Sequence, residues 1–183
     1  FAARARIRQD DYRQMYAESV SDSAGFWGRM GRRLDWIRPY TQVRDVSYDA
    51  ADFRIRWYHD GQLNVAANCL DRHLATRGDQ AALIWEGDDP TQTETITYRE
   101  LYHRVCQLAN ALKAHGIQKG ERVLVYMPMS IEAVVAMQAC ARIGITHSVV
   151  FGGFSAKSVQ ERVVDAGATL VSLLAPAFDP DLV

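Results

Sequence analysis

A short segment with two glycines, Phe151-Gly152-Gly153-Phe154-Ser155, has the composition of an anion-binding turn. It stands between a predicted strand and a predicted helix. Glycines let the backbone approach a ligand closely, and a phosphate at the start of the helix would gain about 0.3–2 kcal/mol from the helix dipole. The same glycines would also make a tight strand-to-helix turn without any ligand, and the residue types alone favour this simpler interpretation. The segment does not match GxGxxG, and the sequence contains no GxxxxGK[ST] motif.

The other residues that could carry out chemistry lack the spacing that catalysis or metal binding requires. Glu86, Asp88 and Asp89 lie in a Gly/Pro turn, where we predict solvated hairpin charges rather than metal ligands. Ser130 and Ser155 are predicted helix caps, and neither lies in a GxSxG motif. The histidines show no HExxH or paired spacing, and we predict no catalytic role for them: His59, His73, His103, His115 and His147.

Two further sets of polar residues favour structural roles. Asn64, Asn68 and Asp71 lie on one helical stretch and could bind a ligand, although hydrogen bonds between helices are the favoured interpretation. The three cysteines do not form a CxxC pair, so their number and spacing suggest neither a disulfide framework nor a zinc site. Each cysteine lies among apolar residues in a helical pattern, which predicts buried, inert thiols and a cytoplasmic protein.

Apolar periodicity from residue 63 onwards predicts alternating strands and helices. Thr97 and Glu100 form a capping box at the start of one helix, and Gly116 can supply its left-handed end. Pro128 ends a strand, and Gly144 closes an alanine-rich helix. We expect a helix through 63–74 with a stop at Gly78, a helix from 98 to the stop at Gly116, and helices at 131–143 and 155–166. We expect strands at 81–85, 95–98, 122–126, 146–151 and 169–175.

The alternation of strand and helix from residue 122 predicts an α/β fold. Apolar strands joined by helices form parallel sheets that are covered on both faces, with right-handed crossovers. Residues 1–62 differ, because they contain three of the four tryptophans, many arginines and little regular alternation. Here we predict helices near 9–20 and 22–34 and then irregular chain. The aromatic residues of this arm would pack on another layer. The predicted organisation is therefore an irregular and helical N-terminal arm, 1–62, and an incomplete, partly parallel, doubly wound α/β subdomain, 63–183.

Charge and hydropathy exclude several classes of partner. A net charge of −1 gives no overall basic field for nucleic acid or an anionic membrane. No stretch approaches the roughly 20 apolar residues of a membrane span. The arginines near the start are interrupted by Asp10 and Asp11, and no apolar core of signal-peptide length follows, which favours a solvated helix over a targeting signal. Because the first residue is Phe1, we expect the natural chain to begin upstream.

Several stretches, in order, resemble the AMP-forming acetyl-CoA synthetases of the adenylate-forming ligase superfamily. The resemblance covers roughly residues 26–171, and the stretches at 64–73 and 84–90 look more like acetyl-CoA than propionyl-CoA or longer-chain ligases. The matching stretches are WIRPY (36–40), LNVAANCLDRH (63–73), ALIWEGD (82–88), ITYREL (96–101), VYMPM (125–129), AMQACARIG (136–144) and HSVVFGGFS (147–155).

The resemblance implies a two-step reaction in a complete enzyme. Acetate would attack the α-phosphate of ATP–Mg²⁺ to give acetyl-adenylate and pyrophosphate, and the thiol of coenzyme A would then displace AMP. In that family the turn that matches Phe151, Gly152 and Gly153 lies against the adenine nucleotide end of coenzyme A. The resemblance therefore changes the favoured interpretation of this turn from a bare turn to a coenzyme A contact.

The resemblance also implies that the catalytic residues lie elsewhere. The family's ATP phosphate loop, acetate-pocket tryptophan, ribose-binding aspartate and catalytic lysine would follow residue 183, so we assign no catalytic residue and no metal ligand here. The tail 175–183 departs from the family, which carries there an arginine-containing segment that holds a phosphate of coenzyme A. We therefore expect a fragment that is inactive alone and exposes edges and apolar surface that promote self-association. The alternatives are a non-catalytic module that binds coenzyme A or a partner subunit, and a ligase for another short-chain acid such as propionate.

Overall fold

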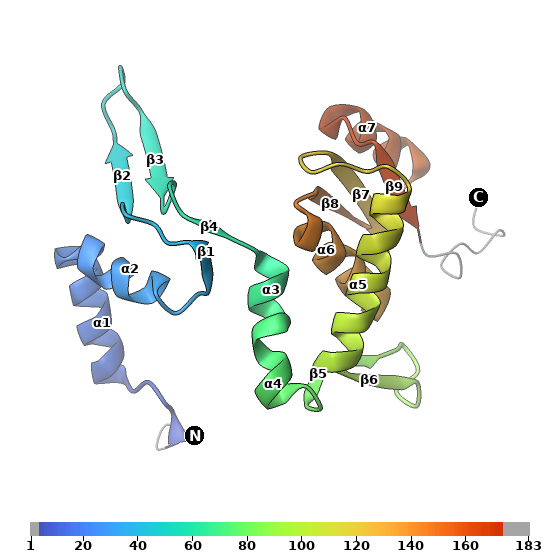
Figure 1. Cartoon of the computed structure of the whole chain (residues 1–183), viewed down its shortest axis with the longest axis horizontal. Helices are drawn as coiled ribbons and strands as arrows, with labels where there is room; N and C mark the ends of the chain where they lie inside the picture. The colour runs from blue at the N-terminus through green and yellow to red at the C-terminus, as the bar shows by residue number, and fades with distance from the viewer. Residues whose placement is uncertain (1–3, 174–183) are drawn as a thin grey trace. The chain divides into compact units, whose positions relative to one another are not determined.

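The computed structural model describes residues 4–173, and these residues form two compact units. The first unit ends at Leu63, and the second unit begins at Asn64. Figure 1 labels the helices and strands of both units. The predicted tail 175–183 lies outside the described residues.

A three-stranded parallel sheet forms the centre of the second unit. Its strands are β7 (Arg122–Met127), β8 (Thr146–Phe151) and β9 (Leu170–Leu173), in the order β8-β7-β9. Val125 of the central strand pairs with Val149 of β8 and with Ser172 of β9. The predicted parallel α/β fold is confirmed. Residues 174 and 175 of the last predicted strand lie outside the described part of the chain.

Helices cover both faces of this sheet. They are α5 (Tyr98–Ala114), α6 (Ile131–Ile143) and α7 (Ala156–Ala166), and α5 packs along α6 (Figure 1). The crossovers β7-α6-β8 and β8-α7-β9 run in opposite directions along the sheet, so right-handed connections place α6 and α7 on opposite faces. Burial along β7 agrees, because Val123 and Val125 join one core cluster with α5 and α6. Leu124, on the other face, is also fully buried.

The ends of these helices follow the predicted capping signals. The Glu100 amide donates to Thr97 Oγ1 at 3.2 Å, and the Thr97 amide donates to Glu100 Oε2 at 2.7 Å. Gly116 has φ +84°, and its amide and that of Ile117 bond back to the last turn of α5. Gly144 ends α6 with φ +75°. Each of these features was predicted from the sequence.

The start of the second unit differs from the single helix predicted at 63–74. It contains α3 (Val65–Cys69), a 3-10 turn η2 (Asp71–His73) and α4 (Leu74–Arg77). The helix breaks at Leu70, where φ is −122° and ψ is −64°. Leu70 is only 2% exposed in the core, and the break brings Asp71 to α6. Tertiary packing therefore overrides the helical periodicity here.

An antiparallel hairpin follows α4. Its strands are β5 (Ala81–Glu86) and β6 (Thr93–Thr97), as predicted apart from their bounds. In the loop between them, Asp89 Oδ1 accepts bonds from the amide and the hydroxyl of Thr91 at 2.9 and 2.7 Å. Glu86, Asp88 and Asp89 are exposed, which confirms their interpretation as hairpin charges.

Arg142, near the end of α6, joins three elements of the second unit. Its guanidinium forms a bidentate pair with the Asp71 carboxylate at 3.2 and 2.5 Å, and it lies over the ring of Tyr102 in α5 at 5.0 Å. Its carbonyl accepts a bond from Asn64 Nδ2 at 2.9 Å. The predicted hydrogen bonding between helices is thus confirmed for Asn64 and Asp71.

The described residues of the first unit form two α-helices and two small antiparallel ladders. The helices are α1 (Gln9–Ser21) and α2 (Ser23–Gly31). Strand β1 (Trp36–Arg38) pairs with β4 (Gln62–Leu63), and β2 (Arg44–Ser47) pairs with β3 (Arg54–Trp57). The prediction of irregular chain after the helices is therefore wrong for these strands. Most of them are too short to show a pattern, but Phe53 to Trp57 alternate between apolar and charged residues and would have indicated β3. The second helix also ends three residues earlier than predicted.

Aromatic residues stabilise the C-terminal end of α2. The last four carbonyls of a helix, here those of Gly28 to Gly31, lack partners within the helix. Tyr58 Oη donates to the Trp27 carbonyl at 2.6 Å, Tyr40 Oη to the Gly28 carbonyl at 2.5 Å, and Trp36 Nε1 to the Gly31 carbonyl at 2.8 Å. The rings of Tyr40 and Tyr58 contact each other with centroids 4.6 Å apart. These aromatic residues therefore pack on one another and on α2, within their own unit, whereas the sequence predicts packing on another layer.

The three cysteines have different environments. Cys140 is buried in α6, and burial raises the pKa of its thiol to about 11, which confirms an inert thiol at this position. Cys106 is half-buried, and Cys69 is exposed at the end of α3. The prediction that all three are buried is therefore wrong, because the helix breaks immediately after Cys69. Within residues 4–173, no helix combines the length and apolarity needed to cross a bilayer.

We expect Arg142→Met to lower the free energy of unfolding by about 1–3 kcal/mol. The substitution leaves the partly buried carboxylate of Asp71, in η2, without its charged partner. Urea unfolding followed by circular dichroism measures the loss. Arg99→Met serves as the control, since Arg99 and Asp79 form an exposed pair that should contribute less than about 1 kcal/mol. Equal losses in the two variants would contradict the role assigned to Arg142.

We expect Thr41→Val to raise the pKa of Asp60 from about 2 towards its ordinary value, because bonds from the Thr41 hydroxyl and amide are the main causes of the depression. A depressed carboxyl pKa stabilises the fold above the unfolded-state value and loses this effect as pH falls through about 2. Carboxyl carbon shifts in an NMR titration report the change. Thr91→Val, at the analogous Asp89 turn, should leave Asp60 unaffected; an unchanged Asp60 pKa in Thr41→Val would contradict the assignment.

Candidate functional site

The predicted site residues lie at the carboxyl end of the parallel sheet. Phe151 is the last residue of β8, and Gly152, Gly153 and Phe154 lead to Ser155, the N-cap of α7. The Phe154 amide donates to the Phe151 carbonyl at 3.1 Å and closes a tight turn. All of these residues are exposed. Ligands of open α/β sheets bind beyond this edge, so the turn is accessible from the expected side.

Both glycines are explained by contacts inside the protein. A Cβ on Gly152 would lie 3.3 Å from the Pro128 nitrogen and 3.4 Å from the Met127 carbonyl carbon, so the turn packs closely on the backbone that follows β7. A Cβ on Gly153 would lie 2.8 Å from Cε1 of Phe151. Neither glycine has a positive φ. Because Gly152 has no side chain, the turn can pack against the backbone at the end of β7. Because Gly153 has none, the Phe151 ring has room beside it.

Tyr126, in the central strand β7, contacts the turn through its hydroxyl group. Its hydroxyl lies 2.9 Å from the Gly152 carbonyl oxygen and 2.7 Å from the Phe154 carbonyl oxygen. A hydroxyl carries one hydrogen, which the two carbonyls share. Tyr126 pairs with Val150 of β8, so the contact joins neighbouring strands. The sequence marks Tyr126 only as a strand residue, and no motif predicted this role.

The first turns of α7 hold the other side of the turn. Ser155 Oγ accepts a bond from the Ser158 amide at 3.3 Å, as the predicted cap requires. Arg162 lies over the Phe154 ring at 4.7 Å, and its Nη1 donates to Ser158 Oγ at 2.5 Å. The first turn of α7 contains no acidic residue and carries Lys157, whereas the first turn of α6 carries Glu132. The start of α7 is therefore the more favourable of the two for an anion.

This arrangement can bind a ligand that has both a ring and an anionic group. The Phe151 side chain is 62% exposed, and its ring lies edge-to-face with Phe154 at 6.3 Å, which leaves ring surface for stacking. Backbone amides and the positive end of α7 lie a few residues away. The described residues here do not include a nucleophile with an adjacent base, so the turn is suited to binding rather than to covalent chemistry.

The remaining candidates take structural positions. Ser130 Oγ accepts a bond from the Ala133 amide and caps α6. His147 lies in β8, and burial lowers the pKa of its ring, which is therefore neutral at physiological pH. His103 and His115 lie on exposed surface of α5 and its end. Among residues 4–173, no three His, Cys, Asp or Glu side chains gather in a way that could hold a metal ion.

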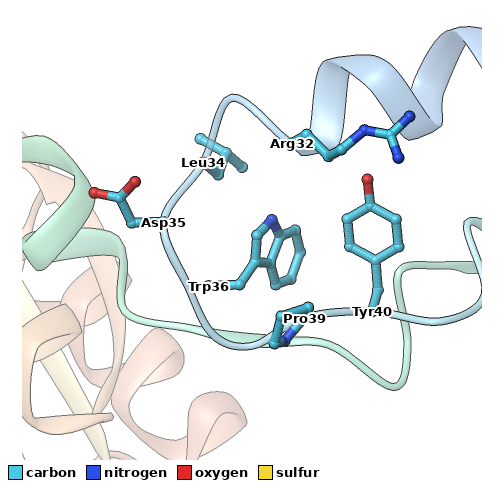
Figure 2. A pocket seen from close by; sticks show the side chains of 6 residues that line it. All are labelled: Arg32, Leu34, Asp35, Trp36, Pro39 and Tyr40. Carbon is cyan, nitrogen blue, oxygen red and sulfur yellow. The ribbon is translucent and has the colours of Figure 1, made fainter.

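A separate pocket lies in the first unit and contains none of the predicted site residues. Its volume is about 580 Å³, and its lining comes from the segment after α2, with Trp36 and Tyr40 as the aromatic walls (Figure 2). Since the polar atoms of both rings bond to carbonyls of α2, the pocket offers a ligand mainly ring surface from these residues. The lining residues are Arg32, Leu34, Asp35, Trp36, Pro39 and Tyr40.

Comparison with protein families divides the sequence close to the boundary between the two units. The family model of the acetyl-coenzyme A synthetase N-terminus matches residues 12–69, and that of the AMP-binding enzymes matches residues 70–180. The second match alone covers more than half of the chain.

Individual relatives extend this comparison. The chain is 56% identical over 170 residues to an acetyl-coenzyme A synthetase of Shewanella amazonensis, and this alignment covers 93% of the chain and 26% of the relative. It is 57% identical over 167 residues to the Rhizobium rhizogenes enzyme of the same name, with 91% and 26% covered. The corresponding Vibrio cholerae enzyme is 54% identical over 169 residues, with 92% and 26% covered. The chain thus spans about a quarter of the length of these relatives. The chain belongs to the AMP-binding enzymes, and its residues 12–69 match the N-terminal region of the acetyl-coenzyme A synthetases.

Proposed function

We propose that this chain is part of an acetate–CoA ligase, which converts acetate, ATP and coenzyme A into acetyl-CoA, AMP and pyrophosphate through acetyl-adenylate. The observation that carries the proposal is 53–57% identity to acetyl-coenzyme A synthetases across more than 90% of the chain. Residues 1–62 would form the N-terminal arm, and residues 63–183 the first part of the large adenylate-forming domain. The unpaired cysteines are consistent with a cytoplasmic enzyme.

Within this enzyme, the turn at Phe151, Gly152 and Gly153 would contact the nucleotide end of coenzyme A. Three features of the turn support this role. The Phe151 ring is exposed enough to stack on a base, the turn lies at the carboxyl edge of a parallel sheet, and the adjoining helix start carries Lys157 but no carboxylate. The residues of the turn bind and orient; they transfer no proton and form no bond with substrate.

ATP and Mg²⁺ would be substrates of the same enzyme, but the described residues do not fit them. The sequence contains no phosphate-loop motif, and residues 4–173 gather no set of metal-ligating side chains. In this proposal none of the described residues catalyses adenylation. Its contribution would be the coenzyme A surface and the scaffold behind it.

We also propose that the chain alone tends to associate with itself. Strands β8 and β9 each have one unpaired edge within the described sheet, and several apolar side chains of this unit are exposed. Met129 is 81% exposed, Ile84 77% and Val149 53%. Unpaired strand edges and exposed apolar surface favour association between chains.

We expect calorimetric titration of the purified 183-residue chain to show binding of coenzyme A, and acetate-dependent ATP–pyrophosphate exchange to stay at background. Binding without exchange follows if the turn holds the nucleotide while the catalytic groups lie elsewhere. Exchange above background would show that this chain contains catalytic groups. Absence of binding would remove the turn as a coenzyme A contact.

We expect Phe151→Ala to weaken coenzyme A binding by about 1–3 kcal/mol, the usual contribution of an aromatic ring stacked on a base. Phe53→Ala is the matched control, because Phe53 is similarly exposed at 66% but lies in the first unit. Calorimetric titrations of both variants measure the difference. If Phe53→Ala weakened binding as much as Phe151→Ala did, the loss would not report stacking at the turn.

A further inference from the structure

We infer that Tyr126 is a positioning residue for coenzyme A, because its hydroxyl orients the peptide groups of the turn so that two backbone amides face the ligand. The inference rests on the proposed coenzyme A contact at Phe151, Gly152 and Gly153. It adds a residue outside that turn, on a different strand, and a second kind of contact besides ring stacking.

The orientation follows from the two hydrogen bonds of Tyr126. The carbonyl oxygens of Gly152 and Phe154 both point towards its hydroxyl, at 2.9 and 2.7 Å. Each carbonyl shares a peptide plane with the next amide, and in a trans peptide the C=O and N–H groups point in opposite directions. The described chain contains no cis peptide bonds. The amides of Gly153 and Ser155 therefore point away from Tyr126.

These two amides are available to a ligand. Gly153 and Ser155 are exposed, and within residues 4–173 neither amide donates to another protein group. The amide between them, of Phe154, is used internally by the Phe151 carbonyl at 3.1 Å. The turn thus alternates inward and outward amides. Gly153 adjoins the exposed Phe151 ring, since a Cβ there would lie 2.8 Å from the ring's Cε1, and Ser155 is the N-cap of α7.

A base or an anionic group is the chemistry that suits such donors. Backbone amides bond to ring nitrogens, carbonyls and phosphate oxygens without side-chain entropy cost, and a positive helix end favours the anionic partner. The nucleotide end of coenzyme A offers each of these acceptors next to a ring that can stack on Phe151. Without the Tyr126 hydroxyl, the Gly152 and Phe154 carbonyls would accept hydrogen bonds from water instead, and their peptide planes could rotate.

The strand that carries Tyr126 is itself fixed on both sides by neighbouring strands. Tyr126 belongs to the central strand, which pairs with both neighbours: Tyr126 is opposite Val150 in β8 and Leu173 in β9. Close packing of Gly152 on the Met127–Pro128 backbone fixes the turn on the same strand. The hydrogen bonds of the Tyr126 hydroxyl therefore fix the Gly152 and Phe154 carbonyls relative to the sheet.

We test the inference with Tyr126→Phe in the 183-residue chain, titrated with coenzyme A in the calorimeter. We expect about three- to tenfold weaker binding, the effect of losing one organising hydrogen bond. The thermal unfolding midpoint should shift no more than in Tyr98→Phe, a control whose ring contacts His73 rather than the turn. In ¹⁵N spectra, the Gly153 and Ser155 amide resonances should move on addition of coenzyme A to wild type, and move less in Tyr126→Phe.

Each outcome decides between the two proposals. If wild type does not bind coenzyme A, the proposed contact fails and the role of Tyr126 fails with it. If wild type and Tyr98→Phe bind and Tyr126→Phe binds equally well, the contact survives and the role of Tyr126 is overturned. If Tyr126→Phe binds weakly only because it unfolds, its midpoint will fall well below that of Tyr98→Phe, and a merely structural role replaces the one inferred.

Discussion

Burial of strand β7 on both faces is the constraint on which the second unit depends. Val123, Leu124 and Val125 are consecutive and almost completely inaccessible, so the strand must be covered by helices on one face and the other. Each such side chain contributes roughly 1.5–3 kcal/mol when it is fully buried. A strand of this kind can only occupy the centre of a sheet. Its position fixes the parallel partners β8 and β9 and, through the crossovers, the sides on which α6 and α7 lie.

The candidate site is an extension of the same strand. Beyond the buried residues of β7, Tyr126 bonds to the turn after β8, and the Met127–Pro128 backbone receives Gly152 in close contact. The turn is exposed but not independent, because a sheet, a helix cap and an arginine–aromatic contact each hold one part of it. A turn that is exposed to solvent and anchored by several contacts is suited to binding a ligand from solution. This arrangement also explains why the residues that orient the turn need not touch the ligand.

The sequence predicted most of the second unit because its signals are local. The capping box at Thr97, the stop at Gly144 and the alternation of apolar strands with helices depend on neighbouring residues. The break at Leu70 could not be predicted, since it results from burial of that side chain and from the contact of Asp71 with Arg142, 71 residues away. The strands of the first unit have only two to four residues, which is too short for a clear pattern in most of them. At β3, however, Phe53 to Trp57 alternate between apolar and charged residues, a local strand signal that the prediction did not use. Residue types also led to the turn at Phe151, but its attachment to Tyr126 is a contact between strands that no local pattern encodes.

An isotope-filtered NOE experiment on the ¹³C-labelled chain mixed with unlabelled coenzyme A would show directly whether the nucleotide lies at the turn after β8. We expect cross-peaks between the adenine protons of coenzyme A and the ring protons of Phe151, because we propose that the base stacks on this exposed ring. Cross-peaks from adenine to other side chains, with none to Phe151, would contradict the placement of the nucleotide at this turn.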